Sequence, residues 1–314
     1  MTSASEDYIT ELRRHLETKY SPRNERIKAV RDRRNLRLEP YIPPKFKALT
    51  QMKPFQYPLV ADVLRRTTAI LGIQHPVPTV IPLGITQDDI KNSSLREKWL
   101  TQAYPRLFLH NTYAQGLDSL FEAGEAIWQV RERLHEWHDI EPKGLKERGK
   151  EYLARTYRHH QATFPFRARY VDPATWYPVY DEDGLTEVME VTKRERLPVM
   201  QRYADLLPHG LRLGDRGPAF YGGEDVDFTE YWSREECVYL VDNTEVYRLE
   251  NNYGQVPSLY AYAIINSSQD CQDWGLSFTY PLLALQDAIS NLITMWMNWG
   301  FLNGYPMLVL DPVA

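Results

Sequence analysis

Apolar residues recur at helical spacing near the C-terminal end of the sequence. From Leu282 to Trp299 they step by three or four positions, which predicts one helix of about five turns that begins after Pro281. The members of this apolar seam are Leu282, Leu285, Ile289, Leu292, Trp296 and Trp299. The opposite face is small and polar, and its one charge is Asp287.

The composition of that polar face indicates how the helix is used. Exposed helix faces of soluble monomers commonly carry Lys and Glu. A long helix without them is expected to be buried on most sides or packed beside copies of itself. We therefore take six residues as candidate oligomer-interface residues: Leu285, Asp287, Ser290, Asn291, Thr294 and Asn298.

The first 50 residues predict a helical extension. Residues 5–20 and 22–37 read as two helices, with Ser5 as a cap for the first and Pro22 in the first turn of the second. Both are more polar than apolar, so we expect them on the surface or against a neighbour. Residues 1–50 hold 12 Lys and Arg against 7 Asp and Glu. A basic arm and a solvated helical extension explain this excess equally well.

The middle of the chain changes from helical to strand patterns. Helices are expected at 57–71, from 86 toward 104 and from 109 to Gly124, which we expect to end its helix and leave 125–130 as a strand. A hairpin around Asp183-Gly184 and a three-stranded meander over 226–250 follow. The order predicts an α+β chain of helices plus an antiparallel meander and hairpin. We divide it into 51–276 as the α+β domain, 277–304 as the long helix and 305–314 as the start of a strand, where the chain is expected to be truncated.

Composition narrows the class of protein further. The chain has 21 Tyr, 10 Phe and 8 Trp, side chains that suit wide contact surfaces. Because the net charge is −5, we do not expect the chain to bind nucleic acid tightly and independently of sequence. The two cysteines cannot build a disulfide framework, so a reducing cytoplasm is the default compartment. Polar residues interrupt 281–310 too often for a membrane span, and we expect no membrane association.

The sequence contains only partial matches to known catalytic motifs. His135 and His138 lie three positions apart, whereas the helical zinc motif needs four, so an exposed polar turn is the favoured reading. Glu122 and Glu125 would be paired carboxylates only if the helix continued past Gly124. The glycines of 210–223 are not followed by Lys-Ser/Thr as in a phosphate-binding loop. The sequence therefore predicts no catalytic residue, no metal site and no cofactor, and we expect a protein that is not an enzyme.

Several stretches resemble, in order, the portal proteins (head-to-tail connectors) of tailed bacteriophages. They resemble that family's early helix and strand, its first long wing helix with the strand after it, its Asp-Pro step into a hairpin, its Asn-x-x-Gly-x-Val-Pro step and the start of its stem helix. The stretches are 57–64, 75–80, 111–130, 169–184, 250–257 and 275–292. The likeness covers roughly residues 55–310 and corresponds to the N-terminal portion of the family, while 139–163 has no counterpart in it.

This resemblance implies a structural role. The 51–276 domain would be a wing, 277–304 a stem helix and 305–314 the start of a clip. The subunit would form a ring, typically of twelve copies, at the capsid vertex of the virion, assembled in the host cytoplasm. Double-stranded DNA would pass through the ring without tight binding during packaging and ejection. A terminase motor, a head-tail adaptor and the major capsid protein would be the partners.

Two other readings remain open at this point. The chain could be another oligomeric phage protein, such as a minor capsid or adaptor component. It could also be a hydrolase of unrecognised type that uses the histidine-rich region 135–160.

Overall fold

The computed structural model of the chain describes residues 5–37, 54–72, 79–82, 84–107, 110–132, 155, 166–182, 184–196, 198–199, 225–263, 270 and 273–304. The helices are α1 (Glu6–Lys19), α2 (Ser21–Arg34), α4 (Leu59–Gly72), α5 (Gln87–Leu107), α6 (His110–Ala123) and α9 (Leu282–Gly304), with a short 3-10 helix η1 (Pro173–Thr175). The strands are β1 (Glu125–Glu132), β2 (Phe166–Val171), β3 (Trp176–Asp181), β4 (Gly184–Glu195), β5 (Asp225–Trp232), β6 (Glu236–Val241), β7 (Thr244–Glu250) and β8 (Ser258–Tyr262). These elements confirm the predicted α+β class.

The strands form two antiparallel sheets. One has the order β2-β1-β8 and the other the order β3-β4-β5-β6-β7. The predicted hairpin is present, because β3 pairs with β4 up to Asp181 and Gly184. The meander is also confirmed: β6 and β7 are joined at Asp242 and Asn243, whose φ angles of 48° and 67° are those of a tight turn.

Alternating side chains give the five-stranded sheet two buried faces. On one face, Met189, Tyr231 and Val238 pack against Ile9 and Leu16 of α1. On the other face, their sequence neighbours Val188, Trp232 and Cys237 pack against Ile127 and Val171 of the three-stranded sheet. The larger sheet is thus covered by α1 on one side and by the smaller sheet on the other.

The N-terminal helices belong to this body. Ile9, Leu16 and Tyr20 of α1 are buried in the core, and Val30 of α2 is buried against α4. Both helices therefore lie at the surface of the body with their apolar sides buried against it. Tertiary packing overrides their polar composition, because a few large apolar residues on one side suffice to bury a helix.

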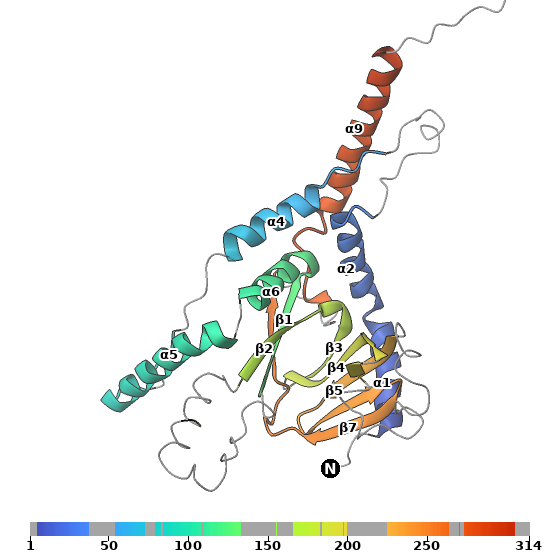
Figure 1. The fold of residues 1–314 in the computed structure, drawn as a ribbon. Helices are drawn as coiled ribbons and strands as arrows, with labels where there is room; N and C mark the ends of the chain where they lie inside the picture. Colours follow the sequence, from blue (N-terminus) through green and yellow to red (C-terminus); the bar gives the residue numbers. More distant parts are fainter. Residues whose placement is uncertain are drawn as a thin grey trace, which may run out of the picture.

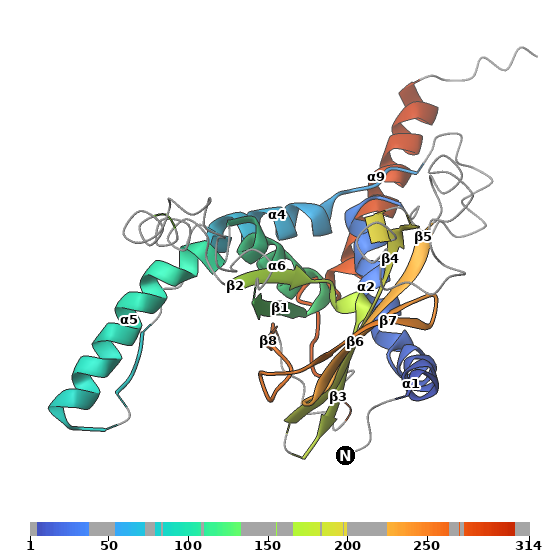
Figure 2. The same cartoon turned by 60° about the horizontal axis from the view of Figure 1, so that its bottom comes forward.

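Two helices extend away from the body. Figure 1 shows α9 rising at one end and α5 projecting on another side, and the second view in Figure 2 agrees. The base of α9 is held where α2, α4 and α6 meet: Val30, Val60 and Leu64 form a buried cluster there, and Phe121, Leu282 and Leu283 pack against it. Among the described helices, none is long and apolar enough to cross a bilayer.

Candidate functional site

Four of the six seam residues of α9 are exposed to solvent, whereas Leu282 packs against the cluster at the base of the helix and Ile289 is half-buried. Trp296 is 71% exposed, Trp299 64%, Leu292 62% and Leu285 50%. Met295 and Met297 are exposed as well. Apolar side chains of this size gain about 1.5–3 kcal/mol each when they are fully buried. Several large exposed apolar side chains on one helix are typical of an interaction site rather than of a free helix.

The polar face of α9 is covered by this chain itself. Gln286, Ser290, Thr294 and Asn298 follow one another at intervals of four residues, and all four are buried. At about 100° per residue, this polar stripe lies on the side of the helix opposite the seam. Residues 54–60, called the strap below, run along the stripe just before and into α4.

Hydrogen bonds join the strap to the stripe in a regular ladder. The backbone N–H of Phe55 donates to Thr294 Oγ1 (2.8 Å), and that of Tyr57 donates to Ser290 Oγ (3.0 Å). The N–H of Val60 donates to Gln286 Oε1 (2.9 Å). Four helical residues rise about 6 Å, and two extended residues span about 6.6 Å. The first interval, from Phe55 to Tyr57, therefore matches one step of four helical residues, and the second takes three residues because the strap turns into α4; the strap runs antiparallel to α9.

Further contacts fix the base of α9. Arg33 of α2 forms an ion pair with Asp287 (2.8 Å), the charged residue of the helix. The Gln286 amide also donates to the carbonyl oxygen of Arg33 (3.2 Å). The first half of α9 is consequently bound to α2 and to the strap, while its seam faces outward.

The six candidate interface residues thus fall into different environments. Leu285 lies on the exposed seam, Asn291 is half-buried and Asp287 pairs with Arg33. Ser290, Thr294 and Asn298 are buried in the polar stripe. For Leu285 and Asn291 an intersubunit role stays a prediction. The hydroxyl groups of Ser290 and Thr294 bind the strap within the chain, and for these residues too an intersubunit role stays a prediction.

Sequence reasoning missed the strap, and it missed Gln286 as a contact residue. One signal was present: four polar residues at intervals of four within an otherwise apolar helix. A second was Pro54-Phe-Gln-Tyr-Pro58, because a residue before proline is restricted to extended conformations. Neither signal says that the two segments meet, since more than 200 positions separate them along the sequence.

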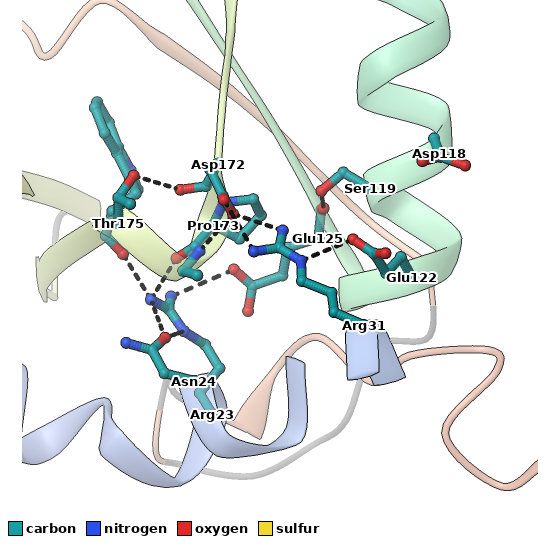
Figure 3. A network of polar contacts seen from close by, with 12 residues as sticks. Arg23, Asn24, Arg31, Asp118, Ser119, Glu122, Glu125, Asp172, Pro173 and Thr175 are labelled. Carbon is teal, nitrogen blue, oxygen red and sulfur yellow. Dashed lines mark hydrogen bonds and ion pairs between the residues drawn. The ribbon is translucent and has the colours of Figure 1, made fainter. Parts of the chain in front are cut away.

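The carboxylates that were considered as a possible catalytic pair, Glu122 and Glu125, form ion pairs with arginines (Figure 3). α6 ends at Ala123, and Gly124 follows with a φ of 87°, so Glu122 belongs to the helix and Glu125 to the strand after it, and each faces a different arginine. Glu122 accepts from Arg31 (3.0 Å) and Arg34 (2.9 Å). Glu125 lies 3.5 Å from the buried Arg23. The two carboxylates are therefore paired with different arginines of α2.

Arginines of α2 dominate this network. Arg31 donates two hydrogen bonds to Asp172, of 2.8 and 2.9 Å, in addition to its bond to Glu122. Burial lowers the pKa of Arg31, but hydrogen bonds to Asp172 and Glu122 outweigh it and raise that pKa above its ordinary value. Arg23 donates to the carbonyl oxygens of Pro173 (2.6 Å) and Trp176 (2.7 Å). The basic excess of the N-terminal region is thus largely used inside the chain.

A second polar network joins the two sheets. Arg169 of β2 pairs with Glu190 of β4 and donates to Gln129 Oε1 of β1 (2.8 Å). Glu230 of β5 pairs with Arg131 and accepts from Trp232 Nε1 (2.5 Å). Burial, with a smaller contribution from Arg169, lowers the pKa of Arg131 to about 10. Each buried carboxylate here has a cationic partner, as a structural network requires.

Three further features of the described residues bear on possible chemistry: the Cys237 thiol, a hollow beside β8 and the distribution of metal-ligating side chains. Burial raises the pKa of the Cys237 thiol to about 12, which leaves almost no thiolate at neutral pH. A hollow of about 720 Å³ beside β8 has one charged side chain among its described lining residues, Arg234. Within the described ranges, no three His, Cys, Asp or Glu side chains gather as a metal site would need. His135, His138 and the rest of the histidine-rich region lie outside those ranges.

Comparison with known proteins assigns no family. No model of a protein family matches the chain, and no curated protein matches it significantly.

Proposed function

We propose that this chain is a non-catalytic portal subunit of a tailed bacteriophage, in which α9 contributes to the stem of a ring at the capsid vertex. Twelve copies would surround a channel through which double-stranded DNA is packaged and ejected. Terminase, a head-tail adaptor and the major capsid protein would contact this ring. The ordered resemblance of the sequence supplies the choice of the portal family.

The observation that carries the proposal is the exposed apolar seam on a helix whose opposite face is already bound. A seam with a spacing of three and four residues packs well against another helix of the same kind. The helix projects from the body, so a neighbouring copy can approach it (Figure 1). In a closed ring the contact is head-to-tail, so the seam of each copy would pack against a different face of the next copy, and the exposed apolar surface would be removed from water.

Charge supports the same reading. Within α9 the one acidic side chain, Asp287, is paired with Arg33, and the sequence 282–304 contains no Lys or Arg. Side-by-side packing of identical helices therefore brings no like charges of α9 together. A channel wall without dense positive charge also leaves DNA free to slide, because phosphate contacts from Lys and Arg are what hold DNA tightly.

The test is the mass and shape of the full chain in solution. We expect a closed ring near twelve copies by native mass spectrometry, with a central channel in electron micrographs. The double variant Leu292→Glu/Trp296→Glu should lose at least 90% of the ring, because it places two charges on the seam. Leu249→Glu on β7, also an exposed apolar position, is the matched control and should assemble normally.

Two outcomes would contradict the proposal. One is a wild-type chain that stays monomeric at concentrations of tens of micromolar. The other is a double variant that forms the same ring as wild type. An assembly without a continuous channel would instead favour another oligomeric protein of the phage particle.

A further inference from the structure

The polar stripe of α9 has the properties of a binding site for extended backbone. Its acceptors, Gln286, Ser290 and Thr294, meet three N–H groups of the strap at 2.8 to 3.0 Å. The hydroxyl groups of Ser290 and Thr294 also donate to carbonyl oxygens four residues earlier, at 2.7 and 2.8 Å. Each hydroxyl is thereby oriented with a lone pair toward the strap.

The strap is built to fit this site. Prolines at positions 54 and 58 favour an extended chain and lower the entropy lost on binding. Proline also has no N–H group to bury without a partner. The last rung, from Val60, satisfies one of the N–H groups in the first turn of α4 that have no partner within the helix.

We propose that the strap is a latch: it binds the polar stripe of α9, fixes the direction of that helix relative to α2 and α4, and covers the stripe against other partners. The occupant of the stripe is the chain's own segment 54–60. Three side-chain rungs, the Arg33–Asp287 ion pair and the Gln286 amide hold the first half of α9. These hydrogen bonds also hold the strap in place, and most of the strap belongs to no helix or sheet.

The latch has a consequence for assembly, and this part rests on the proposed function. A helix with both faces free could associate through the seam or through the stripe. With the strap bound, the stripe is covered and cannot serve as a contact between copies. Removing this alternative contact narrows the geometries in which identical copies meet, which favours a ring with a single number of subunits.

Hydrogen exchange of the full chain tests the latch directly. We expect the amides of Phe55, Tyr57 and Val60 to be protected in wild type. In the triple variant Gln286→Met/Ser290→Ala/Thr294→Val these amides should exchange roughly 100-fold faster. Three hydrogen bonds are lost, and the loss of each is expected to raise the exchange rate by about tenfold or less. Thr294→Ser keeps the hydroxyl group and is the matched control, with exchange close to wild type. Amides of α6 serve as the internal reference for global folding.

A single variant covers the case in which the triple variant does not fold. Thr294→Val is nearly isosteric and removes one acceptor, so exchange at Phe55 should rise about 5- to 10-fold while that at Val60 changes little. Equal exchange of the strap amides in wild type and in the variants would overturn the latch.

Native mass spectrometry of the same samples tests the consequence for assembly. Wild type and Thr294→Ser should give one ring size, and the triple variant should give a broad range of sizes. Identical rings from a triple variant with an unprotected strap would refute the control of assembly by the latch. A protected strap in a wild type that forms no ring would leave the latch standing and refute the proposed function.

Discussion

At the scale of single residues, buried charge determines how the N-terminal helices attach. Arg23 is almost fully buried and reaches two backbone carbonyls as well as Glu125. Glu125 is also buried, and burial raises its pKa above the ordinary value of 4.5 although Arg23 and Arg26 lower it. The carboxylate is therefore held at a cost that its cationic partners offset only in part.

The raised pKa of Glu125 gives a pH dependence with a defined sign. The folded chain holds this proton more tightly than the unfolded chain, so the contribution of Glu125 to stability falls as the pH rises above about 4.5. Glu125→Gln cannot titrate. The free energy of unfolding of wild type minus that of the variant should therefore decrease between pH 4 and pH 8 in urea titrations.

Glu11→Gln, at an exposed position of α1, corrects for the loss of one negative charge. A difference between wild type and Glu125→Gln that stays constant or increases with pH would contradict the assignment.

At the scale of elements, one glycine decides where α6 ends and β1 begins. Gly124 has a φ of 87°, and a Cβ there would lie 2.5 Å from the carbonyl carbon of Leu276. Both the backbone conformation and the close approach of the 276–277 segment exclude a side chain. This segment leads into α9, so the same glycine lets the start of α9 lie against the end of α6.

Gly124→Ala should destabilise the chain by about 2 kcal/mol or more, because it adds backbone strain to a steric clash. Gly300→Ala is the contrasting variant, since a Cβ at position 300 of α9 meets nothing within 4 Å. We expect it to be neutral or to stabilise by up to about 1 kcal/mol. Chemical denaturation measures both, and similar effects of the two variants would refute the explanation.

At the scale of the whole molecule, the buried network between the sheets makes them one unit. Arg169 and Gln129 come from the three-stranded sheet, while Glu190 and Glu230 come from the five-stranded sheet. Apolar contacts of Ile127 and Val171 with Trp176 and Val188 surround this network. The body that carries α9 is therefore expected to unfold cooperatively.

A double-mutant cycle measures this coupling. Arg169→Met and Glu190→Gln should each destabilise by about 2–4 kcal/mol, because each leaves a buried polar partner unsatisfied. The double variant should be less destabilised than the sum of the two, with a coupling energy of about 1–3 kcal/mol. Additive effects in equilibrium denaturation would show that the pair does not connect the sheets.

Local sequence patterns determined much of this protein. The seam of α9, the end of α6 at Gly124, the hairpin at Gly184 and the meander all follow from periodicity and turn residues, which act over a few positions. The apolar seam, which is the centre of the candidate site, was predicted in the same way.

Only the tertiary structure decided what covers each face. Val30 and Leu16 bury helices whose composition is polar, and the strap reaches Ser290 and Thr294 across more than 200 positions. Ser290 has the same local sequence whether water, a neighbouring copy or its own chain binds its hydroxyl group. The sequence by itself therefore determined that α9 forms and which face of it is apolar. The fold decided that the polar face is bound within the chain and that the apolar face is left exposed, because burial depends on contacts between distant segments.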